Sequence, residues 1–230
     1  MNGCGAVLEI VYSLRDFLFP PSCLSCEGEI TGDGLLCSDC FDMFTAAAFK
    51  YKPPQRTIEH VTHYSVLLPY DSACRTIVHS LKYHGMPSIG IIFGKLLAQK
   101  TLAEHTLSEN TILVPVPLHP SRLKDRGYNQ SERIAQGFAA FSGYTLTSDI
   151  LKRTRNTGTQ TALDHGERSQ NVSNAFMYSG EKHLSGTDVV LFDDVMTTGS
   201  TIEACALALK NGGAGKITVC VLATPDVGNE

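Results

Sequence analysis

The chain has 230 residues, of which 43% are hydrophobic and 18% are charged, and its net charge is −4 at pH 7. This composition excludes intrinsic disorder, which requires few apolar residues and a high net charge. The length suggests one medium domain with a smaller appendage. No apolar run approaches the roughly 18 residues of a membrane-spanning helix, so we expect no membrane insertion. The acidic balance gives no general reason to expect nucleic-acid binding, although a local basic patch would be compatible with it.

The first predicted element is an amphipathic helix near the N-terminus. Apolar residues recur at helical spacing from Val7 to Leu18, and Pro20 and Pro21 follow, which predicts a helix that ends there. Charged residues inside the apolar stretch and the lack of a preceding basic region distinguish it from a signal peptide. We therefore expect a cytoplasmic protein, in which the eight cysteines are better suited to metal binding or packing than to disulfides.

Four cysteines form two CxxC pairs, Cys23-x-x-Cys26 and Cys37-x-x-Cys40, with ten residues between them. Each pair can direct two sulfurs at one ion, and the two pairs together complete a tetrahedral site that leaves no position for water. This spacing predicts a structural Zn²⁺ site, whose binding energy would help such a small segment to fold. A redox dithiol pair and an iron–sulfur cluster are the alternatives. Packing is the expected role of the other cysteines, Cys4, Cys74, Cys205 and Cys220.

The chain changes character after the cysteines. Residues 49–56 are polar and contain two prolines, which is typical of a linker. We divide the chain into an N-terminal helix and zinc-finger domain (residues 1–50), a linker (51–59) and a larger domain (60–230).

Strands and helices alternate in the larger domain. Strand-like runs at 111–116, 188–192 and 216–222 alternate with helical patterns at 130–141 and up to about residue 210, where a glycine-rich stop follows. This order predicts an α/β fold with an open, mostly parallel sheet flanked by helices.

The most informative motif is the sequence VVLFDDVMTTGST at residues 189–201. A buried strand delivers two carboxylates to the edge of the sheet where ligands bind. The hydroxyl- and glycine-rich turn then enters a helix, whose N–H groups and dipole favour a phosphate. The carboxylates must face another part of the ligand, such as sugar hydroxyls or a cation, so a sugar phosphate suits the whole motif. The alternative is an ordinary helix N-terminus preceded by solvated acids.

A basic segment follows the strand at 111–116 and contains Arg122, Lys124 and Arg126. We expect it to form a loop at the same edge of the sheet. A diphosphate leaving group gains charge as its bond to a sugar breaks, and cationic donors would stabilise it. Arg126 could bind two oxygens at once. The alternative is a basic surface loop without a ligand.

The 189–201 motif resembles the phosphoribosyl pyrophosphate (PRPP) fingerprint of type I phosphoribosyltransferases. The resemblance implies that Asp193 and Asp194 bind the ribose hydroxyls, that residues 197–201 hold the 5′-phosphate, and that Arg126 contacts pyrophosphate during catalysis with Mg²⁺. Ser200 departs from many members, which have glycine there. The PRPP-binding residues expected from the resemblance are Asp193, Asp194, Val195, Met196, Thr197, Thr198, Gly199, Ser200 and Thr201.

Taken together, the cysteines, the basic segment and the PRPP motif resemble the ComF (competence protein F) family of zinc-finger phosphoribosyltransferase-like proteins. Leu81-Lys82-Tyr83 and the stretch at 151–155 also match. The resemblance implies phosphoribosyl transfer from PRPP to an unidentified acceptor such as a nucleobase, and a link to DNA uptake. It also makes residues 153–168 the candidate for a mobile loop over the substrate.

Two other readings of the chain stay open. The first is a non-catalytic module that binds PRPP, a nucleotide or single-stranded DNA and works with competence proteins. The second is a structural zinc adaptor, which would leave the PRPP motif unexplained.

Overall fold

The computed structural model describes residues 22–30, 34–154 and 175–225. The helix expected at residues 7–18 and most of the candidate loop at 153–168 lie outside these ranges. The chain forms two compact units, residues 1–46 and 47–230, and the boundary falls within helix α2 (Ser38–Lys50). Among the described helices, none has the length and hydrophobicity that crossing a membrane requires.

The first unit is organised by tight turns around its cysteines. The N–H of Cys23 donates to the carbonyl of Gly28 at 2.8 Å, and the N–H of Leu24 donates to the carbonyl of Leu35 at 3.0 Å. Glu27 adopts a positive φ of 61° between them. These bonds bring the chain around Cys23 next to the chain that leads into α2, which carries Cys40 in its first turn.

The second unit contains a five-stranded sheet in the order β1-β7-β6-β2-β3, and every neighbouring pair is parallel. This confirms the predicted open parallel sheet. Its strands, in that order, are β1 (His63–Pro69), β7 (Ile217–Thr224), β6 (Asp188–Val195), β2 (Thr111–Pro115) and β3 (Thr145–Leu146). Every residue of β7 is buried, as expected of a parallel strand covered on both faces.

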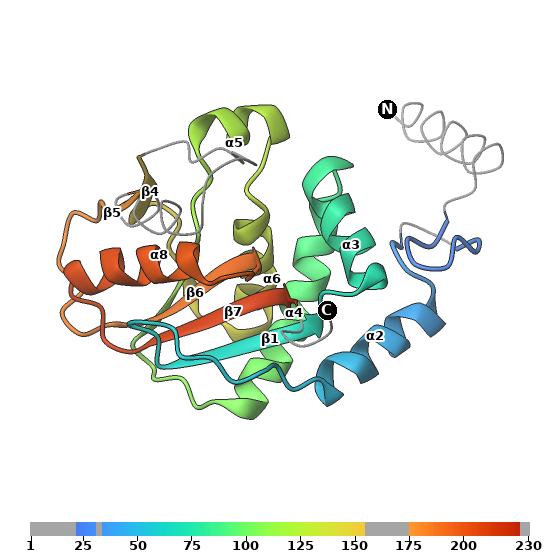
Figure 1. Ribbon diagram of the computed structural model, residues 1–230, viewed down its shortest axis with the longest axis horizontal. Coiled ribbons are helices and arrows are strands. Elements are labelled where there is room, and N and C mark those ends of the chain that lie inside the picture. Colours follow the sequence, from blue (N-terminus) through green and yellow to red (C-terminus); the bar gives the residue numbers. More distant parts are fainter. Residues whose placement is uncertain (1–21, 31–33, 155–174, 226–230) are drawn as a thin grey trace, which may run out of the picture. The chain divides into compact units, whose positions relative to one another are not determined.

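Helices cover both faces of the sheet (Figure 1). On one face, α4 (Ser88–Glu104) and α6 (Gln130–Ser142) pack together, and Phe138 of α6 meets Phe192 edge-on at 5.1 Å. On the other face, α8 (Ser200–Asn211) packs with Leu191 in the core. A short antiparallel ribbon of β4 (Leu151–Arg153) and β5 (Phe176–Tyr178) lies against α8. Helix α3 (Ser72–Tyr83) contacts α4.

The basic segment contains a helix where we expected only a loop. Helix α5 (Pro120–Arg126) starts with proline at its first position, and the side chain of His119 accepts a hydrogen bond from the N–H of Ser121 at 3.3 Å. Proline and an N-cap acceptor both favour a helix start. The helix ends at Gly127, where φ is +80°.

The connections from β2 and β6 diverge at the carboxyl ends of these strands. The chain leaves β2 through α5 and α6 toward β3 on one side, and leaves β6 through α8 toward β7 on the other. Ligands of open α/β sheets bind where the connections diverge in this way, at the carboxyl ends of the strands. Both motifs found in the sequence, the basic segment and the β6–α8 turn (residues 196–199), lie at this switch point.

Candidate functional site

The four cysteines predicted to bind zinc lie together. Their sulfur atoms are all within 4.8 Å of one another, and the Sγ atoms of Cys26 and Cys37 are 3.8 Å apart. Tetrahedral Zn²⁺ with Zn–S bonds of about 2.3 Å separates its sulfurs by about 3.8 Å. The donor set therefore fits a zinc ion with four thiolate ligands.

The thiols of this cluster differ in acidity. Burial acts to raise the pKa of Cys23, but hydrogen bonds from the backbone of Cys26 and Cys37 outweigh it and lower the pKa to about 6. A hydrogen bond with Cys37 is the main cause that raises the pKa of Cys40 to about 12. Four adjacent thiolates repel one another without a cation, so metal binding must displace protons from the cluster.

An open pocket lies at the carboxyl end of β6, with about 210 Å³ of empty space that includes open solvent. Eight of the nine residues expected to bind PRPP line it; Asp194 does not, and Ile202 lines it in addition. The lining residues are Asp193, Val195, Met196, Thr197, Thr198, Gly199, Ser200, Thr201 and Ile202.

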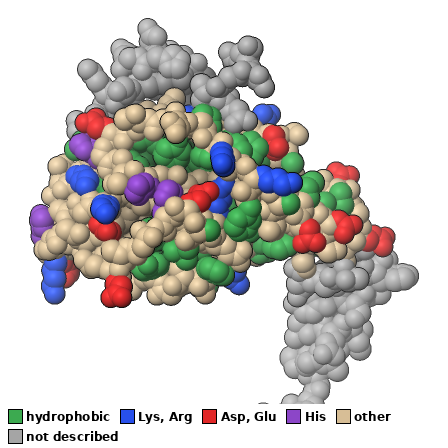
Figure 2. Space-filling view, turned by 90° about the horizontal axis from the view of Figure 1, so that it is seen from below, with side chains coloured by type: hydrophobic (Ala, Val, Ile, Leu, Met, Phe, Trp, Pro, Cys, Tyr) green, Lys and Arg blue, Asp and Glu red, His purple; other side chains and the backbone are tan. Residues whose placement is uncertain are grey.

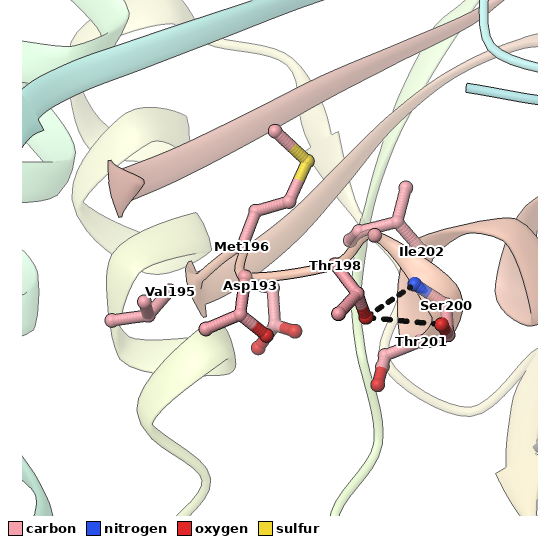
Figure 3. Close-up of a pocket in the computed structure, with 9 residues that line it drawn as sticks. Asp193, Val195, Met196, Thr198, Ser200, Thr201 and Ile202 are labelled. Carbon is pink, nitrogen blue, oxygen red and sulfur yellow. Dashed lines mark hydrogen bonds between the residues drawn. The ribbon is translucent and has the colours of Figure 1, made fainter. Parts of the chain in front are cut away.

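The turn that forms this pocket leaves hydrogen-bond donors free. Gly199 has φ of +90°, a conformation that glycine adopts without strain. The hydroxyls of Thr198 and Ser200 are 3.0 Å apart at the start of α8 (Figure 3). Over the described ranges, the N–H groups of Thr197, Thr198 and Gly199 donate to no protein acceptor. Such a group of free N–H donors at a helix start suits an anion.

The two aspartates have different partners. Asp193 lies at the pocket wall and accepts hydrogen bonds from the Ser131 hydroxyl at 3.0 Å and from the Asp194 N–H at 2.9 Å. Asp194 is buried and forms an ion pair with Lys82 of α3 at 2.6 Å. Neighbouring residues of a strand point to opposite faces of the sheet, which explains why the two carboxylates do not meet in the pocket.

The charges around Asp193 shift the acidity of this site. Burial, followed by the charge of Asp194, raises the pKa of Asp193 from 3.8 to about 7. Burial would lower the pKa of Lys82, but Asp194 more than compensates and raises it. Asp193 therefore keeps a proton at pH values where an ordinary carboxyl group has lost it.

Arg126 is the last residue of α5, the helix that follows β2. Its guanidinium is 5.3 Å from the ring centre of Tyr83, and its positive charge slightly opposes the rise in the pKa of Lys82 that Asp194 causes. Its Nη1 atom and the Oε1 atom of Gln130 are buried and have no hydrogen-bond partner among the residues that the structure describes. A buried, unpaired guanidinium nitrogen is costly, so this donor is suited to a ligand oxygen. Arg122 is half-buried, and Lys124 is exposed.

Sequence reasoning missed two side chains that hold the aspartates, Lys82 and Ser131. Lys82 appeared only as part of a matching family segment, and Ser131 only as the start of a helix. Their partners lie 112 and 62 residues away, so no local pattern could have indicated either contact.

Comparisons with known proteins agree with both units. A family model described as phosphoribosyl transferase domain matches residues 123–230, and one described as double zinc ribbon domain matches residues 14–49. Residues 14–49 contain four cysteines, the same four that form the cluster. The zinc ribbon match supports structural zinc over the redox and iron–sulfur alternatives.

Three similar proteins illustrate the relationship, and two of them match three quarters of the chain or more. The "DNA utilization protein YhgH" of Salmonella typhi is 33% identical over 176 residues, which is 75% of this chain and 74% of that protein. The protein of the same name in Escherichia coli K12 is 31% identical over 209 residues, or 88% and 90% of the two chains. "Competence protein F" of Haemophilus influenzae is 37% identical over 112 residues, or 48% and 49%.

Proposed function

The chain belongs to the ComF family, with a zinc ribbon and a phosphoribosyl transferase domain, and from this premise we propose that it is a phosphoribosyltransferase that binds PRPP together with Mg²⁺. The observation that carries the proposal is the group of free N–H donors in the β6–α8 turn beside the Asp193 carboxyl group. We call the N–H groups of Thr197, Thr198 and Gly199 the anion cup. The anion cup suits the phosphate of a sugar phosphate, and the neighbouring carboxylate suits the hydroxyls of its sugar.

Each part of PRPP has a counterpart among these residues. The N–H groups and hydroxyls of residues 197–201 bind the 5′-phosphate, and Asp193 accepts hydrogen bonds from the ribose hydroxyls. Arg126, with its unpaired Nη1, binds the pyrophosphate. Asp194 is paired with Lys82 and does not line the pocket. Its contribution is the negative charge that helps to raise the pKa of Asp193.

Magnesium has a suitable protein ligand in the pocket. Carboxylate oxygens are the usual protein ligands of Mg²⁺, and Asp193 is the carboxylate that lines the pocket. When bound with PRPP, Mg²⁺ offsets the negative charge of the pyrophosphate.

The transfer breaks the bond between C1 of the ribose and a pyrophosphate oxygen. The electron pair leaves with pyrophosphate, whose growing charge Arg126 stabilises. A lone pair of the acceptor forms the new bond to C1, and the acceptor loses a proton to solvent. Orientation and electrostatics supply the rate, so no nucleophile from the protein is required.

Titration calorimetry with PRPP and Mg²⁺ tests the proposal. We expect wild-type protein to bind, and Asp193→Asn to weaken binding by about tenfold or more, as loss of a charge-assisted hydrogen bond implies. Glu109→Gln is the matched control because it removes an exposed carboxylate just before β2, at the opposite edge of the sheet. Wild-type protein that does not bind PRPP would overturn the proposal. Pyrophosphate release with a panel of nucleobases then identifies the acceptor.

A DNA-handling module is the second candidate. The cationic residues of α5 favour it, and so does the name of the relatives, DNA utilization protein. Figure 2 shows a different face of the molecule from below, and there the Lys and Arg side chains are scattered among acidic ones and form no continuous stripe. Single-strand binding that weakens steeply with salt would support this candidate, whereas lack of binding at low salt would exclude it.

A further inference from the structure

An arginine from the predicted linker reaches the pocket-forming turn. The Nη1 of Arg56 donates to the carbonyl oxygen of Thr197 at 2.5 Å, and its Nη2 donates to the carbonyl oxygen of Pro225 at 3.2 Å. One guanidinium thus joins the β6–α8 turn to the chain that leaves β7. Residue 56 precedes Thr197 by 141 positions.

The backbone that carries Arg56 is itself fixed. The hydroxyl of Tyr64, on β1, donates to the carbonyl of Pro54 at 2.5 Å and accepts the N–H of Arg56 at 3.0 Å. Ile58 is buried in the same core cluster as Met196. Residues 51–58, within the predicted linker, therefore pack within the second unit. The backbone is fixed before Arg56 at Pro54, at Arg56 itself, and after it at Ile58.

Arg56 determines how one peptide group of the turn is oriented. In a trans peptide, the carbonyl of one residue and the N–H of the next point in opposite directions, and the described residues contain no cis peptide. Because Arg56 holds the carbonyl of Thr197, the N–H of Thr198 points away from the guanidinium. Arg56 is not among the residues that line the pocket, whereas Thr197 and Thr198 are.

We infer that Arg56 is a positioning residue for the phosphate end of the ligand. It contacts the backbone of the turn and not the ligand, keeps the Thr198 N–H available to a phosphate oxygen, and adds positive charge behind the anion cup. This inference rests on the proposed function, because it assumes that the turn binds a sugar phosphate. It assigns a role in substrate binding to a segment outside the PRPP motif.

Calorimetry with two halves of the substrate separates this role from a general effect on the fold. The full-length protein is titrated with ribose 5-phosphate and, separately, with inorganic pyrophosphate and Mg²⁺. We expect Arg56→Gln to weaken ribose 5-phosphate binding about tenfold, the loss of roughly one charge-assisted hydrogen bond, and to leave pyrophosphate binding unchanged. Arg56→Lys keeps the positive charge and can still donate a hydrogen bond to one of the two carbonyls, so we expect its affinity for ribose 5-phosphate to fall less, by about threefold. Lys52→Gln, which removes an exposed cation from the same segment, is the control and should match wild type.

The outcomes distinguish the inference from the proposed function. Wild-type protein that binds neither ligand overturns both. If the wild type binds and Arg56→Gln has the same affinity for ribose 5-phosphate, the inference alone is overturned. The inference is also overturned if Arg56→Gln loses affinity for ribose 5-phosphate and for pyrophosphate equally, because Arg56 is then merely structural. If Arg56→Gln does not fold, Arg56→Lys decides, and equal affinity of Arg56→Lys and wild type for ribose 5-phosphate then overturns the inference.

Discussion

Asp193 and Asp194 are neighbours in the chain but differ in electrostatic surroundings. Asp194 has its charge balanced by Lys82 at 2.6 Å. Asp193 has no cation as close within residues 22–30, 34–154 and 175–225, and burial together with Asp194 raises its pKa to about 7. The pocket therefore contains a carboxyl group whose ionisation is unfavourable until a ligand with hydroxyl donors or a cation arrives.

This shift predicts that Asp193→Asn stabilises the protein, and more so at higher pH. The folded-state pKa of Asp193 lies above its unfolded value near 3.8, so between about pH 4 and pH 7 the folded chain binds more protons than the unfolded chain. Stability is then lost as pH rises through this window. Asparagine does not titrate, so the melting temperature gained by Asp193→Asn should grow from pH 5 to pH 7 and level off above it.

Differential scanning calorimetry of both proteins between pH 5 and pH 8 measures this gain. Glu109→Gln, which changes an exposed carboxylate, should show no such trend. A gain for Asp193→Asn that is the same at every pH would contradict the raised pKa.

At the scale of whole elements, α4 and α6 pack closely because they meet at glycines. A Cβ at Gly94 would collide with the backbone carbonyl of Ile134, and one at Gly137 would collide with the backbone of Ile91. Backbone atoms cannot rotate away as side chains can. The position of α6, and with it the contact from Ser131 to Asp193, depends on this approach.

We predict that Gly94→Ala destabilises the protein by about 3 kcal/mol, at the upper end of the usual cost of overpacking a core, because the two helices must move apart. Gly143→Ala is the comparison: it has no close neighbour, but its φ is +79°, so strain alone should cost about 1 kcal/mol. Urea denaturation of the two variants measures both free energies of unfolding. Equal costs would contradict the close-packing explanation.

The sequence predicts some of these elements much better than others. For β6, α8 and β7, a long buried apolar run, a glycine turn and the stop at Gly212 are all local signals, and the structure has the elements there. Strand β1 was not identified because its buried apolar residues, Val66, Leu67 and Leu68, form a run of only three. Helix α5 buries none of its seven residues, so it has no hydrophobic periodicity to detect.

The same distinction applies to the candidate site. The pocket-lining turn is one continuous stretch, so its residues could be listed from the sequence. Lys82, Ser131 and Arg56 belong to separate segments that folding brings together. The local composition around Arg56, with two prolines and polar neighbours, even indicated a linker. The contacts of Arg56 with Tyr64 and Thr197 are visible only in three dimensions.

At the scale of the molecule, the two units are stabilised by different means. The second unit has a buried sheet covered by helices, whereas the first has its four cysteines at the turns that shape it. Small segments with little core usually depend on such a metal for folding. We therefore expect the full-length protein to contain one zinc ion per chain.

Removing zinc should affect the first unit alone. With a strong chelator, hydrogen exchange of the full-length protein should lose protection in residues 34–46 and keep it in β6 and β7. Cys37→Ser should release zinc without a chelator, and Cys74→Ser, which changes a buried cysteine outside the cluster, should retain it. An iron chromophore, or zinc retained by Cys37→Ser, would contradict the assignment.

Helix α8 begins after a glycine, and that residue supplies no side chain to cap it. Glycine at this position costs a helix only about a few tenths of a kcal/mol relative to a residue with a capping side chain. An oxyanion seated on the first turn would complete the helix from outside the polypeptide. Such an oxyanion would bind the folded chain and not the unfolded chain. The thermal stability of the protein would therefore increase with the concentration of the oxyanion.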